Sequence, residues 1–493
     1  MKPSSLLSSI HPATEPDTLA FLERAEIDAS TRGPVLLFFG SAVFWLLFGS
    51  VLGLLAAWKM THPGLLDSLG FLTFGRIRPA HLNSVIYGWA SQAGIGTGIW
   101  LMARLSRVSL MHTKLLVSAA IFWNLGVLVG VLGILAGDSR SIEWLEFPGY
   151  ATPILFVAYA CIGVWAVIIF RFRKPGHIYV SQWYLLAAFL WFPWMYATAN
   201  ILLVWQPIQG SAQGAVNWWF AHNILGLWFT PIGLASAYYL IPKVIGRPIH
   251  SYYLSILGFW TLALFSNWSG MHHLIGGPFP AWMISTSVVA SVMMFIPVVT
   301  VAINYHMTMS GHFEALKWSP TLRFTVFGAL AYTVVSLQGI SMAIPSVNTL
   351  THFTDYTIGH AHLGLYGFFS MMMFGAIYYI VPRLVGWEWP SATMIRWHFW
   401  LVAIGILLMV GSLTVGGILQ GVALYDPTVS FRSSLDFATP FRWLRGISGV
   451  LLLAGHLVFA SLFVLMLLKA GPRREGPALL ATPAENPSQT TAA

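Results

Sequence analysis

Twelve long apolar runs dominate this chain. Each run is about 20 residues or longer, which is the length that a helix needs to cross the hydrocarbon core of a bilayer. Hydrophobic residues make up 57% of the sequence and charged residues 8%, whereas an ordinary soluble domain carries about 25% charged residues. The sequence therefore predicts an all-α polytopic membrane protein and excludes a water-soluble globular one. The runs are centred on 34–57, 81–103, 112–136, 150–170, 181–204, 219–241, 253–273, 280–305, 322–344, 357–382, 395–420 and 443–468.

The charges predict how these twelve spans are oriented. Most of the 25 Lys and Arg residues fall on the side that holds both ends of the chain, so the positive-inside rule predicts that both termini are cytoplasmic. This bias also accounts for the net charge of +9, and nucleic-acid binding is not invoked. We expect a cytoplasmic N-terminal tail (1–33), one twelve-helix membrane domain (34–468) and a disordered cytoplasmic C-terminal tail (469–493).

The cysteine content limits the metal chemistry. Cys161 is the one cysteine of the sequence, so disulfide frameworks, iron–sulfur clusters and thiolate zinc sites are excluded. The sequence has no CxxCH motif, and we therefore expect no c-type haem on this chain.

Histidines are the candidate functional groups, because an ionisable side chain within a membrane span is a functional candidate by default. For any one of them, the alternative is a neutral imidazole that hydrogen-bonds between helices. Six histidines fall towards the same, non-cytoplasmic face in the predicted topology, whereas His398 and His456 do not join this layer and are interpreted as packing residues. The six are His81, His222, His272, His273, His360 and His362.

The spacing of these histidines indicates more than one cofactor. His360 and His362 point about 200° apart on a helix, so they cannot share one metal but can bind two different cofactors. The adjacent His272 and His273 can form a three-nitrogen metal site with His222, since imidazole suits copper, zinc and iron. With His81 as a second axial ligand, the set provides for a six-coordinate haem, a five-coordinate haem and a metal. An open haem position that faces an open metal position is a site for reducing a small diatomic gas.

Several motifs carry a resemblance to a known family. They are RIRPAHLNSVIYGWA (76–90), WWFAHNILGLW (218–228), YYLIPKVIGRPIHSYYLSILGFW (238–260), WSGMHHL (268–274), VNTLTHFTDYTIGHAHLGLYG (347–367) and FRWLRGISG (441–449). Over about residues 34–468, the chain resembles subunit I of the haem-copper oxidase superfamily, most closely the C-family of cbb-type cytochrome c oxidases. The resemblance implies the fold of that subunit and its location in a bacterial or archaeal cytoplasmic membrane.

The resemblance also implies roles for individual residues. His81 and His362 would bind a low-spin haem b, and His360 would bind a high-spin haem that is also expected to be b-type. His222, His272 and His273 would hold the non-haem metal. Further implied roles are haem-propionate neutralisation by Arg445 and Arg442, a place near propionates or a bound cation for Asn348 and His352, and a proton path through Tyr252 and Ser255.

The sequence departs from the family at the proposed active site. C-family oxidases carry a tyrosine six residues before the His-His pair, where this chain has Ser266 followed by Asn267. The glutamate expected in the ninth span is Gln338, which can hydrogen-bond His360 but cannot carry a proton. Nitric oxide reductases place a glutamate four residues after the first metal histidine, where this chain has Gly226. Three imidazoles without a carboxylate favour copper over iron.

These departures shape the predicted function. Reducing oxygen takes four electrons, one of which the family tyrosine supplies, whereas reducing two nitric oxide molecules to nitrous oxide takes two. We therefore predict a copper-containing nitric oxide reductase. The alternatives are an oxygen-reducing cbb-type oxidase that recruits another redox residue, such as Trp268, and a non-redox transporter or assembly partner.

The sequence also indicates where the electrons come from and whether the protein pumps protons. Electrons would come from a partner subunit that carries a c-type haem or a dicopper centre, and membrane lipid would surround the chain. All sixteen Asp and Glu residues fall outside the hydrophobic interiors of the spans. Because a proton pump needs buried titratable groups, we expect weak or no pumping.

Overall fold

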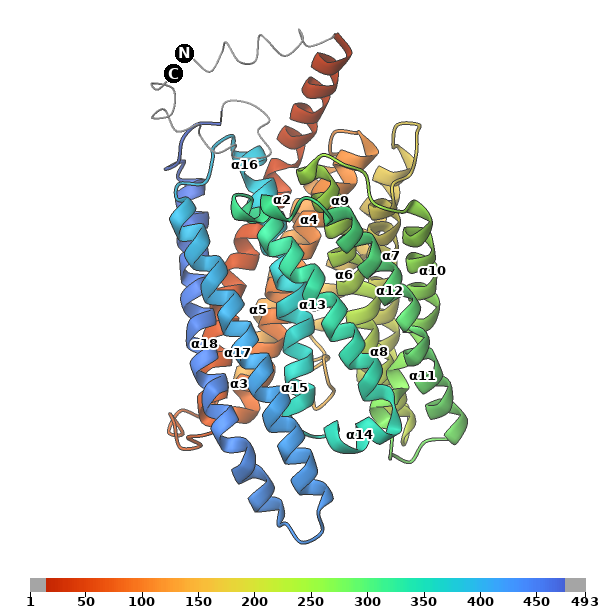
Figure 1. Cartoon of the computed structure of the whole chain (residues 1–493), viewed down its shortest axis with the longest axis vertical. Coiled ribbons are helices and arrows are strands. Elements are labelled where there is room, and N and C mark those ends of the chain that lie inside the picture. The colour runs from red at the N-terminus through yellow and green to blue at the C-terminus, as the bar shows by residue number, and fades with distance from the viewer. Residues whose placement is uncertain (1–14, 475–493) are drawn as a thin grey trace.

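Twelve helical rods stand side by side in the structure, a computed structural model that describes residues 15–474 (Figure 1). The rods are, in chain order, α2 (Glu15–Lys59); α3 (Phe74–Asn83), η2 (Ser84–Ala90) and α4 (Ser91–Ser106); α5 (Thr113–Ala136); α6 (Thr152–Arg171); α7 (Val180–Asn200) and η3 (Ile201–Trp205); α8 (Ala212–Asn223), η4 (Ile224–Phe229) and α9 (Thr230–Ile245); α10 (Tyr252–Ser269) and η5 (Gly270–Leu274); α11 (Ala281–Met293) and α12 (Phe295–Met309); α13 (Pro320–Ala343); α15 (Asp355–His362), η7 (Leu363–Ser370) and α16 (Met371–Val385); α17 (Ala392–Tyr425); and α18 (Phe431–Leu467). Short elements in the loops are η1 (Gly70–Leu72), η6 (Phe313–Lys317) and α14 (Pro345–Thr351).

The prediction of twelve membrane helices is confirmed. Within the described residues, ten of the rods are long and apolar enough to cross a membrane, and the rods α3–η2–α4 and α10–η5 complete the set. Large apolar side chains cover the outside of the bundle, such as Phe44, which is 58% exposed, and Trp397, which is 60% exposed. A helix satisfies its own backbone hydrogen bonds, so such a surface is stable against lipid.

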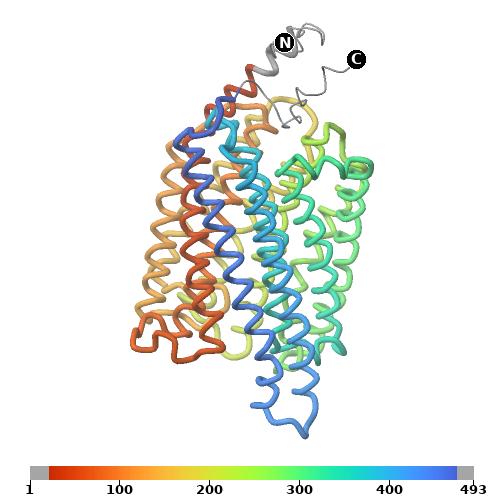
Figure 2. Tube along the Cα trace, turned by 60° about the vertical axis from the view of Figure 1, so that its left-hand side comes forward, coloured from red at the N-terminus to blue at the C-terminus, as the bar shows by residue number. Residues whose placement is uncertain are grey.

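The first rod begins before the predicted boundary at residue 33. Helix α2 starts at Glu15, so the second half of the predicted N-terminal tail continues the first span as helix. Glu23 ties this extension to the bundle through ion pairs with Arg107 and Lys174, both 2.9 Å long. The start of α2 and the end of α18 lie at the same end of the bundle (Figures 1 and 2). Residues 1–14 and 475–493 of the two predicted tails lie outside the described residues.

Two rods lie at the centre of the bundle. In the rod α15–η7–α16, 94% of the most apolar stretch is buried, and in α8–η4–α9 the share is 78%, against 39% for α11–α12. A helix that is apolar on all sides is stable where other helices surround it. The two central rods carry His360, His362 and His222, so three of the six histidines come from the most enclosed part of the molecule.

Wide π-helical turns follow three of the histidine-bearing helices. The segment η2 begins three residues after His81, η4 begins two residues after His222, and η7 begins directly after His362. A π turn inserts an extra residue into the helix and is frequent at functional sites.

Candidate functional site

All six histidines of the predicted layer line one cavity of about 490 Å³ inside the bundle. They come from α3, α8, η5 and α15, and Figure 1 shows α3 and α15 at the end of the bundle opposite the start of α2. The structure thus brings together the six imidazoles that the sequence analysis singled out: His81, His222, His272, His273, His360 and His362.

His81 and His362 are held in the same way. The Nδ1 of His81 donates to the carbonyl of Gly49 at 2.7 Å, and the Nδ1 of His362 donates to the carbonyl of Ile358 at 2.8 Å. Such a bond fixes the tautomer and leaves Nε2 with a free lone pair. Gly53 makes the room for one ring, since a Cβ there would lie 2.5 Å from Cε1 of His81. With Nε2 free on both rings, His81 and His362 are a pair of imidazoles that would hold one haem.

His360 has a side chain rather than a backbone group behind it. Its Nδ1 lies 3.3 Å from Oε1 of Gln338, so the amide oxygen accepts the Nδ1 hydrogen and Nε2 remains free. A Cβ at Gly339 would lie 3.1 Å from Cε1 of His360. This imidazole, oriented by a neutral amide, would hold a second haem.

The other three imidazoles form a separate group. The ring centres of His272 and His273 are 4.3 Å apart, and the ring centre of His222 lies 5.4 and 6.0 Å from them. The Nδ1 of His272 lies 2.9 Å from Oγ of Ser291. The Nδ1 of His222 is buried without a hydrogen bond of ordinary geometry to any residue in the described part of the chain.

This group fits a metal by the chemistry of its donors. Burying an imidazole nitrogen without a partner costs free energy, and a metal ion would relieve that cost at His222. Within residues 15–474, no three His, Cys, Asp or Glu side chains lie close enough together to coordinate one metal ion as they stand. The fit therefore rests on three neutral imidazoles and one orphaned nitrogen, a donor set that suits copper.

Ser266 and Gly226 lie together on the cavity wall. The Oγ of Ser266 lies 3.3 Å from Oδ1 of Asn223, and a Cβ at Gly226 would overlap that same Oγ. The neighbouring Asn267 accepts a hydrogen bond of 3.1 Å from the indole of Trp219. Ser266 thus places a hydroxyl on this part of the cavity wall.

The two arginines expected near haem propionates have different surroundings. Arg445 lines the cavity, with its Nη1 2.8 Å from Sδ of Met60. Arg442 instead donates from Nε to Oδ2 of Asp355 at 2.8 Å, in an ion pair whose side chains are largely buried. Of these two arginines, Arg445 is therefore the one that a cofactor in this cavity would meet.

Four other expected residues lie outside the cavity lining. Asn348 donates to the carbonyl of Met342 at 3.0 Å, and His352 stacks on the neighbouring Phe353. Tyr252 and Ser255 lie near the start of α10, about 26 Å and about 21 Å from its other end at Ser269. Tyr252 donates to the carbonyl of Ile178, and Ser255 donates to the carbonyl of Tyr252.

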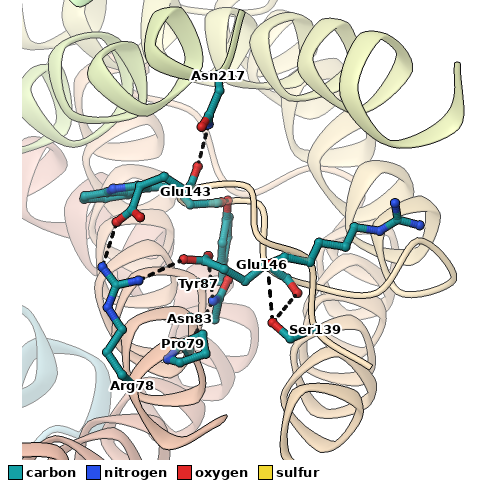
Figure 3. A network of polar contacts seen from close by, with 10 residues as sticks. Arg78, Pro79, Asn83, Tyr87, Ser139, Glu143, Glu146 and Asn217 are labelled. Atoms are coloured by element: carbon teal, nitrogen blue, oxygen red, sulfur yellow. Dashed lines mark hydrogen bonds and ion pairs between the residues drawn. The ribbon is translucent and has the colours of Figure 1, made fainter. Parts of the chain in front are cut away.

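A carboxylate network that the sequence analysis did not identify borders the cavity (Figure 3). Arg78 lies between two glutamates of the loop before α6, 2.9 Å from Glu143 and 3.6 Å from Glu146. Both Arg78 and Glu143 line the cavity. The buried Asn83 donates to Oε2 of Glu146 at 3.0 Å.

This network corrects the expectation about buried titratable groups. Glu146 lies outside the apolar spans, as expected, yet it is only 4% exposed. Burial raises its pKa from the usual 4.5 to about 7. The inference that such groups are missing was wrong because a loop can fold back into the bundle. The sequence did contain one indication of this network: Glu143 and Glu146 lie three residues apart in a loop on the same side of the membrane as the histidines.

Comparisons with known proteins show what the whole chain is similar to. Residues 33–451 match the family described as Cytochrome C and Quinol oxidase polypeptide I. The cbb3-type cytochrome c oxidase subunit CcoN1 of Stutzerimonas stutzeri is 35% identical over 436 residues, which cover 85% of this chain and 91% of that protein. A nitric oxide reductase subunit of the same species is 29% identical over 263 residues, covering 50% of this chain and 54% of that protein. A solved haem-copper terminal oxidase dimer shares the fold, with a TM-score of 0.74 at 16% identity over 91% of this chain and 86% of that one.

Proposed function

Because the chain belongs to the Cytochrome C and Quinol oxidase polypeptide I family, we propose that its six-histidine cavity holds two haems and a copper ion and reduces nitric oxide to nitrous oxide. The chain is a multi-pass membrane oxidoreductase and a catalytic subunit of the haem-copper oxidase type. The proposal concerns the gas that it reduces, the non-haem metal that it binds and the donor of its electrons.

The proposed ligand roles follow from the free ring nitrogens. His81 and His362 would hold the low-spin haem, His360 the high-spin haem, and Arg445 would pair with a propionate. When bound, the high-spin haem and the metal supply two electrons and two open coordination positions for the gas. The chain itself orients the ligand rings through Gly49, Ile358 and Gln338.

Ser266 is the single observation that carries the choice of nitric oxide. A serine hydroxyl does not give up an electron as a phenol does, so position 266 does not supply the extra electron that oxygen cleavage requires. Reducing two nitric oxide molecules takes two electrons and two protons and forms nitrous oxide and water. This reaction needs no electron from residue 266, so it can proceed with a serine at that position.

Position 226 supplies no carboxylate to the three imidazoles, which supports copper. Gly226 has no side chain, and Ser266 fills the space where one would begin. Three neutral imidazoles give a stronger site for copper than for ferrous iron on the general affinity order. Electrons would enter from a partner subunit with a c-type haem or a dicopper centre, on the face where Arg445 lies. By the distribution of Lys and Arg, both termini would be cytoplasmic.

Oxygen reduction is the second candidate. The relative with 35% identity is named a cytochrome c oxidase subunit, and two tyrosines, Tyr332 and Tyr366, line the cavity. Either phenol could replace the missing one if it lay close enough to the reacting atoms.

Turnover of the purified complex distinguishes the two candidates. Nitric oxide and oxygen consumption would be measured with the same electron donor, and nitrous oxide by gas chromatography. We expect one nitrous oxide per two nitric oxide molecules and slow oxygen consumption. Rapid oxygen reduction with little nitrous oxide would reject the proposal. His222→Ala should abolish nitric oxide turnover. His398 is buried but does not line the cavity, so the control variant His398→Gln should retain turnover.

A further inference from the structure

Three polar side chains form a connected group on the cavity wall, here called the triad: Ser50, His456 and Tyr366. The Oγ of Ser50 lies 2.7 Å from Nδ1 of His456, and the hydroxyl of Tyr366 lies 2.5 Å from Nε2 of the same ring. The three residues come from α2, α18 and η7, so the group joins three separate rods. His456, which the sequence analysis assigned to packing, therefore has both ring nitrogens bonded at the cavity.

The direction of each hydrogen bond follows from its partners. Ser50 also lies 2.6 Å from the carbonyl of Leu46, and because a carbonyl can only accept, the single hydroxyl hydrogen of Ser50 is donated there. The Nδ1 of His456 must then donate to Ser50, so Nε2 accepts the hydrogen of Tyr366. Every hydrogen of the triad is used within the protein, and the two oxygens keep lone pairs that can face the cavity.

The triad lies next to the ligands of the low-spin haem. Ser50 follows Gly49, whose carbonyl accepts from His81. Tyr366 comes one turn, about 6 Å, after His362 along its rod.

The triad also lies far from the propionate partner. His456 comes eleven residues after Arg445 on α18, which is about 16 Å along the axis. Both residues line the same cavity, so a haem with its propionates at Arg445 would have its opposite edge at the triad.

We propose that the triad forms a polar contact for this edge, and that it positions the low-spin haem and lowers its midpoint potential. The inference rests on the proposed binding of that haem by His81 and His362. Oxidised haem iron carries one more positive charge than reduced iron. The negative ends of fixed dipoles therefore stabilise the oxidised form, and they act strongly in a medium of low dielectric.

The chain offers a matched control pair for this proposal. The hydroxyl of Tyr378 lies 2.8 Å from Nδ1 of His398, and both side chains are buried. Neither residue is among those that line the cavity. The control pair also joins a tyrosine hydroxyl to an imidazole inside the bundle, but it has no place at the haem edge.

The test is a redox titration of the purified complex, followed by the absorbance of the low-spin haem. In Tyr366→Phe we expect a positive shift of its midpoint potential, with the other haem unchanged, because the phenolic oxygen is removed. In Tyr378→Phe we expect no shift. An unchanged potential in Tyr366→Phe, or an equal shift in both variants, overturns the inference.

Further variants keep the test decisive. If Tyr366→Phe does not accumulate, Ser50→Ala removes the other oxygen, and an unchanged potential there also overturns the inference. His456→Gln can accept from Tyr366 and donate to Ser50, so it should stay near the parent potential, whereas His456→Leu should shift upward. A parent complex without the spectrum of a bis-histidine haem contradicts the proposed function. A normal parent spectrum with unshifted variants contradicts this inference alone.

Discussion

Ser266 and Gly226 occupy one space, because a Cβ at Gly226 would overlap Oγ of Ser266. The two residues come from different rods, α10 and η4, and meet on the cavity wall. Each is a departure from a resembled pattern, the serine from the oxidase tyrosine and the glycine from the reductase glutamate. The contact shows that these are not independent, since a glutamate at 226 would displace Ser266.

A methyl group at position 226 should therefore destabilise the protein. Overpacking a filled interior costs about 1–3 kcal/mol, so we expect Gly226→Ala to lower the melting temperature of the purified complex. The double variant Gly226→Ala with Ser266→Gly should recover most of that loss, because the second change frees the space. Equal melting temperatures for the parent and Gly226→Ala would show that Ser266 can move aside without cost and would contradict this prediction.

Ser291 should control the metal through His272. Its Oγ lies 2.9 Å from Nδ1 of the ring, and it donates to the carbonyl of Ser287, so the imidazole must be the donor. Removing such an outer partner weakens metal binding roughly 10–100-fold. We expect Ser291→Ala to lose metal to a chelator at a correspondingly lower concentration and Ser291→Thr to retain it. Identical retention in the alanine variant would refute a positioning role.

Glu146 should make the stability of the protein depend on pH. Because burial raises its pKa to about 7, the folded state holds the proton more tightly than the unfolded chain. The resulting stabilisation is fully present below the usual glutamate pKa of 4.5 and is lost as the pH rises through about 7. Melting temperatures should thus fall between about pH 5 and about pH 8.

Two variants separate this effect from the loss of an ion pair. Glu146→Gln cannot ionise, so its melting temperature should change less over the same pH range and exceed that of the parent at the alkaline end. Glu143→Gln removes the other carboxylate that faces Arg78. Because the charge of Glu143 also raises the pKa of Glu146, this variant should weaken the pH dependence without abolishing it. A parent-like slope in Glu146→Gln would assign the dependence to another group.

Arg442 should act through stability and Arg445 through the cofactor. Removing one member of a buried ion pair costs about 3–5 kcal/mol, so Arg442→Met should strongly lower the melting temperature by stranding Asp355. Adding Asp355→Asn should restore part of the loss. Arg445→Gln should instead shift the redox potential of a haem. A potential shift in Arg442→Met equal to that in Arg445→Gln would contradict this division of roles.

The sequence was sufficient for the fold and for the six histidines. Apolar runs long enough for a bilayer leave few alternatives to a helical bundle, and the alternation of spans places helix ends on defined faces. That reasoning put His81, near the start of the second span, on the same face as His272, at the end of the seventh. Both line the cavity.

The sequence was not sufficient for groups whose position depends on tertiary packing. Glu146 belongs to a polar loop, and only the folded chain shows that the loop returns to the bundle. His456 lies outside the histidine layer along its helix, yet the large cavity reaches it. Arg442 and Arg445 are equivalent by motif, and Asp355 distinguishes them by pairing with the first.

The count of cofactors in the purified complex tests most directly whether six imidazoles hold two haems and one copper ion. Haem would be measured as the pyridine haemochrome, which separates b-type from c-type haem, and copper and iron by elemental analysis. We predict two b-type haems and one copper per chain, after subtraction of metals carried by a partner subunit, with His222→Ala losing the copper and keeping both haems. A single b-type haem, or non-haem iron in place of copper, would contradict this prediction.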